Sequence, residues 1–125
     1  MFQSIVVAVD GSDPANRALH AACALARAFG SEVHLIHAHD GPAAAKPTSV
    51  LEAARALASD DGVTPSSATS VVGDPFDEIM TIAGLYGADL IVTGRRGLGG
   101  ISGMLAGSTS QQIAKNADCA HLSVK

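Results

Sequence analysis

Aromatic residues are scarce in this chain: it has three Phe, one Tyr and no Trp, only 3% of the residues. Because 47% of the residues are nonetheless hydrophobic, the core must be built from aliphatic side chains. Charged residues reach only 16%, too few for a disordered chain, which combines low hydrophobicity with high charge. A chain of 125 residues suits one domain.

Basic residues are few as well. Eight Lys and Arg stand against twelve Asp and Glu, which gives a formal net charge of −4. This balance disfavours a nucleic-acid partner, because nucleic-acid binding needs cations that displace counterions from phosphates. Arg95 and Arg96 are adjacent, so positive charge is concentrated at one place in the sequence.

Long apolar runs and paired cysteines are also missing. The apolar run near the N-terminus is about six residues long, too short for a signal peptide or a membrane span. Cys23 and Cys119 are far apart and fit no metal or redox spacing, so we expect free thiols. We therefore expect a cytoplasmic protein with no membrane partner.

The sequence does contain a regular alternation of strand and helix patterns. Apolar β-branched runs are typical of strands buried on both faces, and apolar residues at helical spacing lie between them. Asp13 or Ser12 can cap the first helix, Gly30 can end it, and Ser49 opens a capping-box pattern for the second. Strands are predicted at 4–9, 32–37, 68–72, 88–94 and 120–125, with helices at 14–29, 49–60, 75–86 and 108–117.

This alternation predicts an α/β fold: a three-layer, doubly wound, five-stranded parallel sheet with helices on both faces. If the strand order is 3-2-1-4-5, the order reverses between the first and fourth strands. Ligands of such sheets bind beyond the carboxyl ends of the strands at that reversal. Asp10 and Gly94 end or follow these two strands, so they mark the expected ligand mouth.

A glycine-rich segment begins at this mouth, with six glycines between Thr93 and Gln111. Without side chains to cover them, backbone N–H groups can approach a ligand, and the helix predicted near Ser108 adds its unpaired first N–H groups. Such a loop is typical of a phosphate cradle. It is not a Walker loop, because no Lys lies between Lys46 and Lys115, and no G-x-G-x-x-G follows the first strand.

The spacing of these glycines is that of a known family. Gly94, two residues, Gly97, nine residues, Gly107 and Ser108 form the pattern G-2x-G-9x-G-[S/T], which resembles the ATP-binding branch of the universal stress protein family. The stretches "IVVAVDGSDP", "HLIHAHD" and "VVGDPFDEI" are similar to that family too, so the resemblance covers nearly the whole chain. It implies an adenine-nucleotide alpha-hydrolase-like fold, with 1–125 as one universal stress protein domain.

The resemblance implies a nucleotide site occupied by ATP, ADP or AMP, with Mg²⁺ as a cofactor. Asp10 would face the ribose or hold Mg²⁺ on the phosphates, and the backbone of Ala38, after the second strand, would read the adenine edge. No residue is assigned a catalytic role. The implied nucleotide-binding residues are Val9, Asp10, Ala38, Thr93, Gly94, Arg96, Gly97, Gly107, Ser108 and Thr109.

The resemblance also implies a regulatory role in a stress response and a homodimer formed through the last strand. His121 and Ser123 depart from the apolar pattern of the family on one face of that strand. We expect no nucleic-acid partner, and at most slow ATP hydrolysis or self-phosphorylation, because the loop contains no evident general base.

Other interpretations stay open. Asp10 could merely cap the first helix, and His37 and His39 share a strand face at a spacing that can bind metal, although no further ligand is arranged beside them. The protein could be a nucleotide-hydrolysing or adenylyl-transferring enzyme, but such relatives carry a glycine-rich loop where this chain has "DGSDP". It could also be a dimerising stress protein that binds no nucleotide.

Overall fold

The structure is a computed structural model that describes residues 1–39, 47–95 and 107–125, without the side chains at 47, 48, 107 and 108. Its strands all run parallel in the order β3-β2-β1-β4-β5, as the sequence predicts. The elements are β1 (Ser4–Ala8), α1 (Asp13–Phe29), β2 (Glu32–His39), α2 (Pro47–Asp60), β3 (Ser67–Val72), α3 (Pro75–Leu85), β4 (Leu90–Gly94), α4 (Gly107–Asn116) and β5 (Ala120–Val124).

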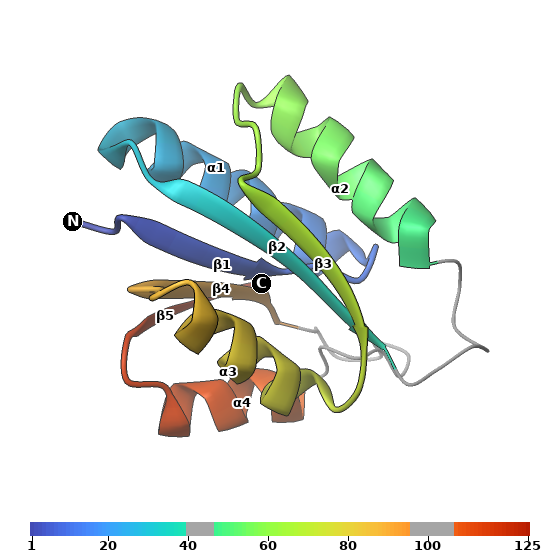
Figure 1. Ribbon diagram of the computed structural model, residues 1–125, viewed down its shortest axis with the longest axis vertical. Coiled ribbons are helices and arrows are strands. Elements are labelled where there is room, and N and C mark those ends of the chain that lie inside the picture. The colour runs from blue at the N-terminus through green and yellow to red at the C-terminus, as the bar shows by residue number, and fades with distance from the viewer. Residues whose placement is uncertain (40–46, 96–106) are drawn as a thin grey trace.

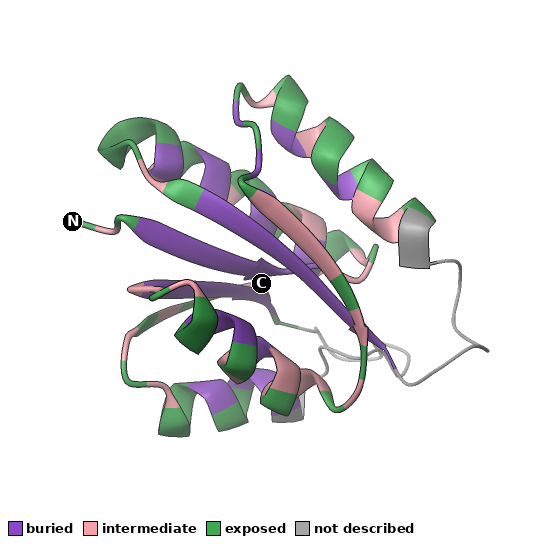
Figure 2. Cartoon of the chain, in the orientation of Figure 1, coloured by how far each residue is buried: buried purple, intermediate pink, exposed green. Residues whose placement is uncertain are grey.

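The helices cover the sheet from both sides: α1 and α2 lie on one face, and α3 and α4 lie on the other (Figure 1). Successive side chains of β1 point to opposite faces. Ile5 and Val7 therefore join the cluster under α1 and α2, whereas Val6 joins the cluster under α3 and α4. Both clusters are aliphatic, and β1 and most of β2 are buried between them (Figure 2).

Local signals place the ends of the helices. Ser12 is the N-cap of α1, since its Oγ accepts a hydrogen bond from the N–H of Ala15, and Gly30 ends that helix with φ = 69°, as predicted. The expected start of α2 is wrong by two residues. The helix begins at Pro47 rather than Ser49, because the fixed φ of proline suits the first helical turn.

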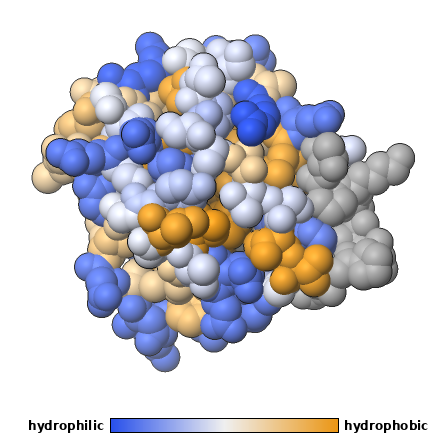
Figure 3. All heavy atoms as spheres, in the orientation of Figure 1, coloured by the Kyte–Doolittle hydropathy of each residue, from blue (hydrophilic) through white to orange (hydrophobic). Residues whose placement is uncertain are grey.

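The outer parts of the molecule are mostly polar. Figure 3 shows a largely hydrophilic face, on which hydrophobic residues gather around β3 and α3; Val72 and Leu85 are among the exposed ones. Within the described residues, no helix is long and apolar enough to cross a bilayer.

Candidate functional site

The reversal of strand order places the expected mouth between β1 and β4. These two strands are hydrogen-bonded neighbours, with Val7 opposite Val92, so their carboxyl ends lie side by side. Asp10 follows β1, and Gly94 is the last residue of β4. The two residues that the sequence assigns to the mouth therefore lie at the same edge of the sheet.

The carboxylate of Asp10 is half-buried and holds the turn that leads into α1. Its Oδ1 accepts the N–H of Ser12 at 2.9 Å, across Gly11 with φ = 83°. Asp10 is thus a turn acceptor and not the helix cap, a role that belongs to Ser12. The bond fixes the carboxylate at the mouth through Oδ1. Among the described residues Oδ2 has no hydrogen-bond partner, so it remains for a ligand.

Gly94 is required by packing. A Cβ at this position would lie 2.4 Å from the carbonyl carbon of Pro14 and 2.5 Å from the nitrogen of Ala15. This glycine is the last residue of β4, and its absent side chain lets the first turn of α1 approach the sheet. The start of α1 is thereby held against the mouth.

Ala38 lies within β2 rather than after it, because β3 pairs with β2 as far as His39 and so lengthens the strand beyond the predicted end. The N–H of Val9 donates to the carbonyl of Ile36 at 2.9 Å, so the backbone groups of Ile36 point toward β1. Those of Ala38, two residues later, point the same way. Since the pairing of β1 ends at Ala8, the N–H and C=O of Ala38 face the mouth.

Val9 itself is already engaged by β2. Its N–H bonds to Ile36, its carbonyl accepts from Nδ1 of His37 at 2.9 Å, and its side chain is buried in the core. His37 is therefore a buried polar group that closes the end of β1. The ring of His39 stacks on it, with Nε2 at 3.2 Å from the Oγ of Ser70. Among the described residues, no group of three His, Cys, Asp or Glu is placed to hold a metal ion.

The side chain of Thr93 points away from the mouth. It is fully buried, with Oγ1 at 2.9 Å from Nε2 of His121 and 3.4 Å from the Oγ of Ser110. A ligand at the mouth could therefore meet only the backbone of Thr93. Thr109 is buried in the first turn of α4.

The start of α4 is where the sequence places it. Gly107 and Ser108 open the helix, so the last part of the glycine pattern lies at a helix N-terminus. Two further predicted residues, Arg96 and Gly97, lie outside the described residues.

Sequence reasoning missed a polar cluster between α4 and β5. It recognised a polar face on the last strand but did not predict that His121 and Ser123 point toward α4, where the Oγ of Ser123 is 2.9 Å from the Oγ of Ser110. Burial lowers the pKa of His121 below its ordinary value. The signal in the sequence was Ser110 of the "GSTS" segment, whose hydroxyl meets β5 only once α4 packs on the sheet.

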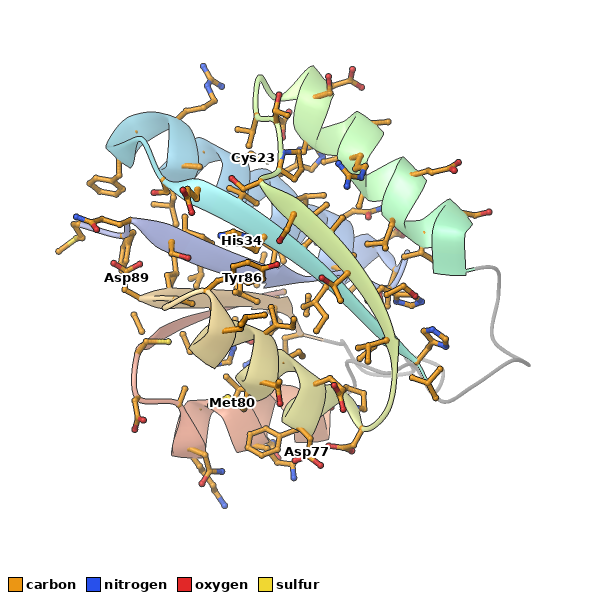
Figure 4. All side chains as sticks on the ribbon, viewed as in Figure 1. Cys23, His34, Asp77, Met80, Tyr86 and Asp89 are labelled. Atoms are coloured by element: carbon orange, nitrogen blue, oxygen red, sulfur yellow. The ribbon has the colours of Figure 1, made fainter. Side chains whose placement is uncertain are left out.

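The opposite, amino edge of the sheet carries structural polar groups. The ring of His34 stacks on Tyr86 with centroids 4.0 Å apart, and Asp89 accepts the N–H groups of Gln3 and Ser4 (Figure 4). The bond from the Gln3 N–H is the main reason why the pKa of Asp89 lies below its usual value. These groups tie α3 and β4 to the first strands, far from the carboxyl ends.

The chain belongs to the universal stress protein family, whose model matches residues 1–125. A Thermus aquaticus protein described as the universal stress protein in the QAH/OAS sulfhydrylase 3′ region is 35% identical over 137 aligned residues, which cover all of both chains.

Solved structures of the family share the fold. A universal stress protein in complex with cAMP matches with a TM-score of 0.80 and 26% identity, covering 99% of this chain and 97% of that one. The universal stress protein of Archaeoglobus fulgidus in complex with dAMP matches with a TM-score of 0.77 and 26% identity, covering 98% of each chain. Some structural neighbours of this chain therefore bind adenine nucleotides.

Proposed function

We propose that this protein binds ATP at the mouth between β1 and β4 and serves as a nucleotide-dependent regulatory module of a cytoplasmic stress response. The observation that carries the proposal is the pair of backbone groups of Ala38 that face the mouth beside the carboxylate of Asp10. One N–H and one C=O match the acceptor and donor on the edge of adenine. The cAMP and dAMP complexes of two neighbours support an adenine nucleotide as the ligand class.

The phosphates would lie at the start of α4. The first N–H groups of a helix have no partner within it, and the helix dipole favours negative charge there. Gly107 and Ser108 supply this terminus, and Gly97, assigned from the sequence pattern, would complete the cradle. ADP or AMP would use fewer of these contacts.

Mg²⁺ would accompany the triphosphate, with Asp10 as its protein ligand. The ion prefers oxygen ligands and is usually held by one or two carboxylates together with phosphate oxygens. The Oδ2 of Asp10 fits this need, because the turn uses only Oδ1. When bound, the ion neutralises phosphate charge, while Asp10 orients the tail toward α4.

The experiment is a calorimetric titration of ATP with Mg²⁺ into the purified protein and into two glycine variants. Gly107→Val places a side chain in the proposed phosphate space and should abolish binding. Gly84→Val is the matched control, because a Cβ at Gly84 meets nothing within 4 Å, and it should bind like the parent. Circular dichroism verifies that both variants fold.

Two outcomes of this titration would replace the proposal. Equal binding by the Gly107→Val variant would place the nucleotide elsewhere, and no binding by the parent would favour the dimerising protein without nucleotide. Rapid ATP turnover in the presence of a second substrate would favour an enzyme. Mass spectrometry of small molecules released from the purified protein would identify the occupant.

We also propose a homodimer through β5, which is an edge strand paired only with β4 among the described residues. The carbonyl of Val124 accepts the N–H of Arg95, so the backbone groups of Ser123 point to the open edge. Ser123→Pro removes one edge N–H and should shift the protein toward monomer in sedimentation, whereas Ser123→Ala should not. Identical sedimentation of the two variants would exclude this edge.

A further inference from the structure

A polar hollow of about 300 Å³ lies between the end of β4, α4 and β5, on the sheet face opposite α1. None of its lining residues is among those assigned to the nucleotide mouth, although Arg95 lies between Gly94 and Gly97 in the sequence. Two hydroxyl groups, a guanidinium, an imidazole and a carboxamide converge on it from these three segments. Its lining residues are Arg95, Ser110, Gln111, Ala114, His121 and Ser123.

Three of the lining side chains, those of Ser110, His121 and Ser123, belong to a continuous hydrogen-bonded network that includes the buried Thr93. Nε2 of His121 contacts Oγ1 of Thr93 at 2.9 Å, Thr93 contacts Ser110 at 3.4 Å, and Ser110 contacts Ser123 at 2.9 Å. Thr93 and Ser110 are buried, and Ser123, the last member of this hydrogen-bonded series, is exposed. The hydrogen-bonded series therefore connects the half-buried imidazole of His121 to the hydroxyl of Ser123, which faces the hollow.

The charge of the hollow is positive. Arg95 is exposed and contributes a permanently charged fork of N–H donors, and no acidic residue lines the space in the part of the chain that the structure describes. If Nε2 of His121 donates to Thr93, each hydroxyl donates to the next, and Ser123 presents its O–H outward. Protonation of His121 enforces the same direction. The hydrogen-bonded series can therefore direct its O–H donors toward an anion that is bound by Arg95.

We propose that this hollow is a second site, separate from the nucleotide mouth, that binds the phosphate group of a small molecule. The hollow offers many hydrogen-bond donors: a guanidinium, two hydroxyls and a carboxamide. A carboxylate has only two oxygens to accept them, whereas a phosphate has enough oxygens to accept all of them. The ligand is a free phosphate compound, and the tail of a nucleotide bound in the neighbouring mouth is the rival source that the test below distinguishes. The proposal does not depend on ATP binding, since no lining residue is assigned to the mouth.

Binding to this site is linked to protonation of His121. Among the described residues, Arg95 is the charged group that lines the same hollow as this ring. A bound anion favours the imidazolium, so the pKa of His121 rises on binding and affinity increases as pH falls. Sulfate is the probe for this linkage, because its charge does not change between about pH 5 and pH 8, whereas that of phosphate does.

The test is a titration of inorganic phosphate followed by the NMR signals of the histidine rings at constant ionic strength. The His121 signal, assigned by its loss in His121→Gln, should shift, while the other four histidines stay unchanged. Arg95→Gln should weaken phosphate binding roughly tenfold or more, the loss of one charge-assisted hydrogen bond. Arg55→Gln removes the same charge from an exposed position on α2 and should have no effect.

The outcomes separate this proposal from its rivals. Equal weakening by the two arginine variants, or no shift of His121, would mean nonspecific ion binding and overturn it. Sulfate affinity that does not change between pH 8 and pH 5 would overturn the linkage. If ATP by itself shifts the His121 signal and prevents phosphate from binding, the hollow holds the nucleotide tail, and the proposal of a separate site is overturned. If the His121 signal responds to phosphate in the same way with ATP bound, the second site is supported.

Discussion

The mouth between β1 and β4 and the hollow beside β5 lie at the same edge of the sheet but are built in opposite ways. The mouth is formed by backbone and by missing side chains: Ala38 presents its N–H and C=O, and Gly94 lets α1 approach. The hollow is formed by side chains that bond to one another, with Ser110, His121 and Ser123 in its wall. A backbone site leaves a pattern of glycines in the sequence, and a side-chain site leaves scattered polar residues.

The largest expected effect is on the free energy of unfolding, which should respond differently to substitution of two glycines of the same pattern. Gly94→Val would drive its side chain into the backbone of Pro14 and Ala15, so we expect it to lower the free energy of unfolding by about 3 kcal/mol or more. Gly107→Val should change stability little, because position 107 is the first residue of α4. Urea unfolding measures both, and equal stability of the two variants would contradict the packing role of Gly94.

A large effect on binding is expected at Asp10. Asp10→Ala should weaken ATP binding in the presence of Mg²⁺ by roughly thirtyfold, about 2 kcal/mol, because a charge-assisted contact is lost. Asp13→Ala removes the same charge from an exposed position in the first turn of α1 and should bind normally. Calorimetry compares them, and unchanged affinity of the Asp10 variant would leave its carboxylate a purely structural role.

The two regions should also respond differently to the loss of one hydroxyl. Thr93→Val keeps the shape of the side chain but leaves Nε2 of His121 without its partner, at an expected cost of about 1–2 kcal/mol in unfolding free energy. ATP affinity should stay the same, because only the backbone of Thr93 reaches the mouth. A loss of ATP affinity at unchanged stability would reverse this assignment.

The fold could be predicted because its signals are local. Buried β-branched runs, caps such as Ser12 and Gly30, and the alternation of strands and helices predicted a parallel sheet covered on both faces. The order 3-2-1-4-5 was assumed rather than derived from these local signals, and the structure confirms it. The errors have tertiary causes. β2 extends to His39 because β3 pairs with it there, and the polar face of β5 turns toward α4 because of the parallel register with β4.

The mouth could be predicted in outline but not in its details. Asp10 and Ala38 followed from topology and from the family pattern, and the structure adds the direction in which their groups point. The packing role of Gly94 and the inward direction of Thr93 could not be foreseen, since both depend on how closely α1 and α4 approach the sheet.

The smallest expected effect is a dependence of stability on pH. Burial lowers the pKa of His121 below 6.5, so the unfolded chain binds this proton more readily than the folded one. The contribution of the neutral ring to stability should be complete above about pH 6.5 and decline as the pH falls toward the folded-state pKa. Unfolding of His121→Gln should lack this component, and an identical pH profile for variant and parent would exclude it.

The most direct test of the account is an amide NMR spectrum of the protein recorded with and without ATP and Mg²⁺. We predict a downfield shift of the Ala38 amide as its N–H bonds to adenine, with further shifts at Asp10 and Gly94 and none at Gln3 or Asp89 on the opposite edge. An Ala38 signal that stays in place while ATP is bound would contradict the account.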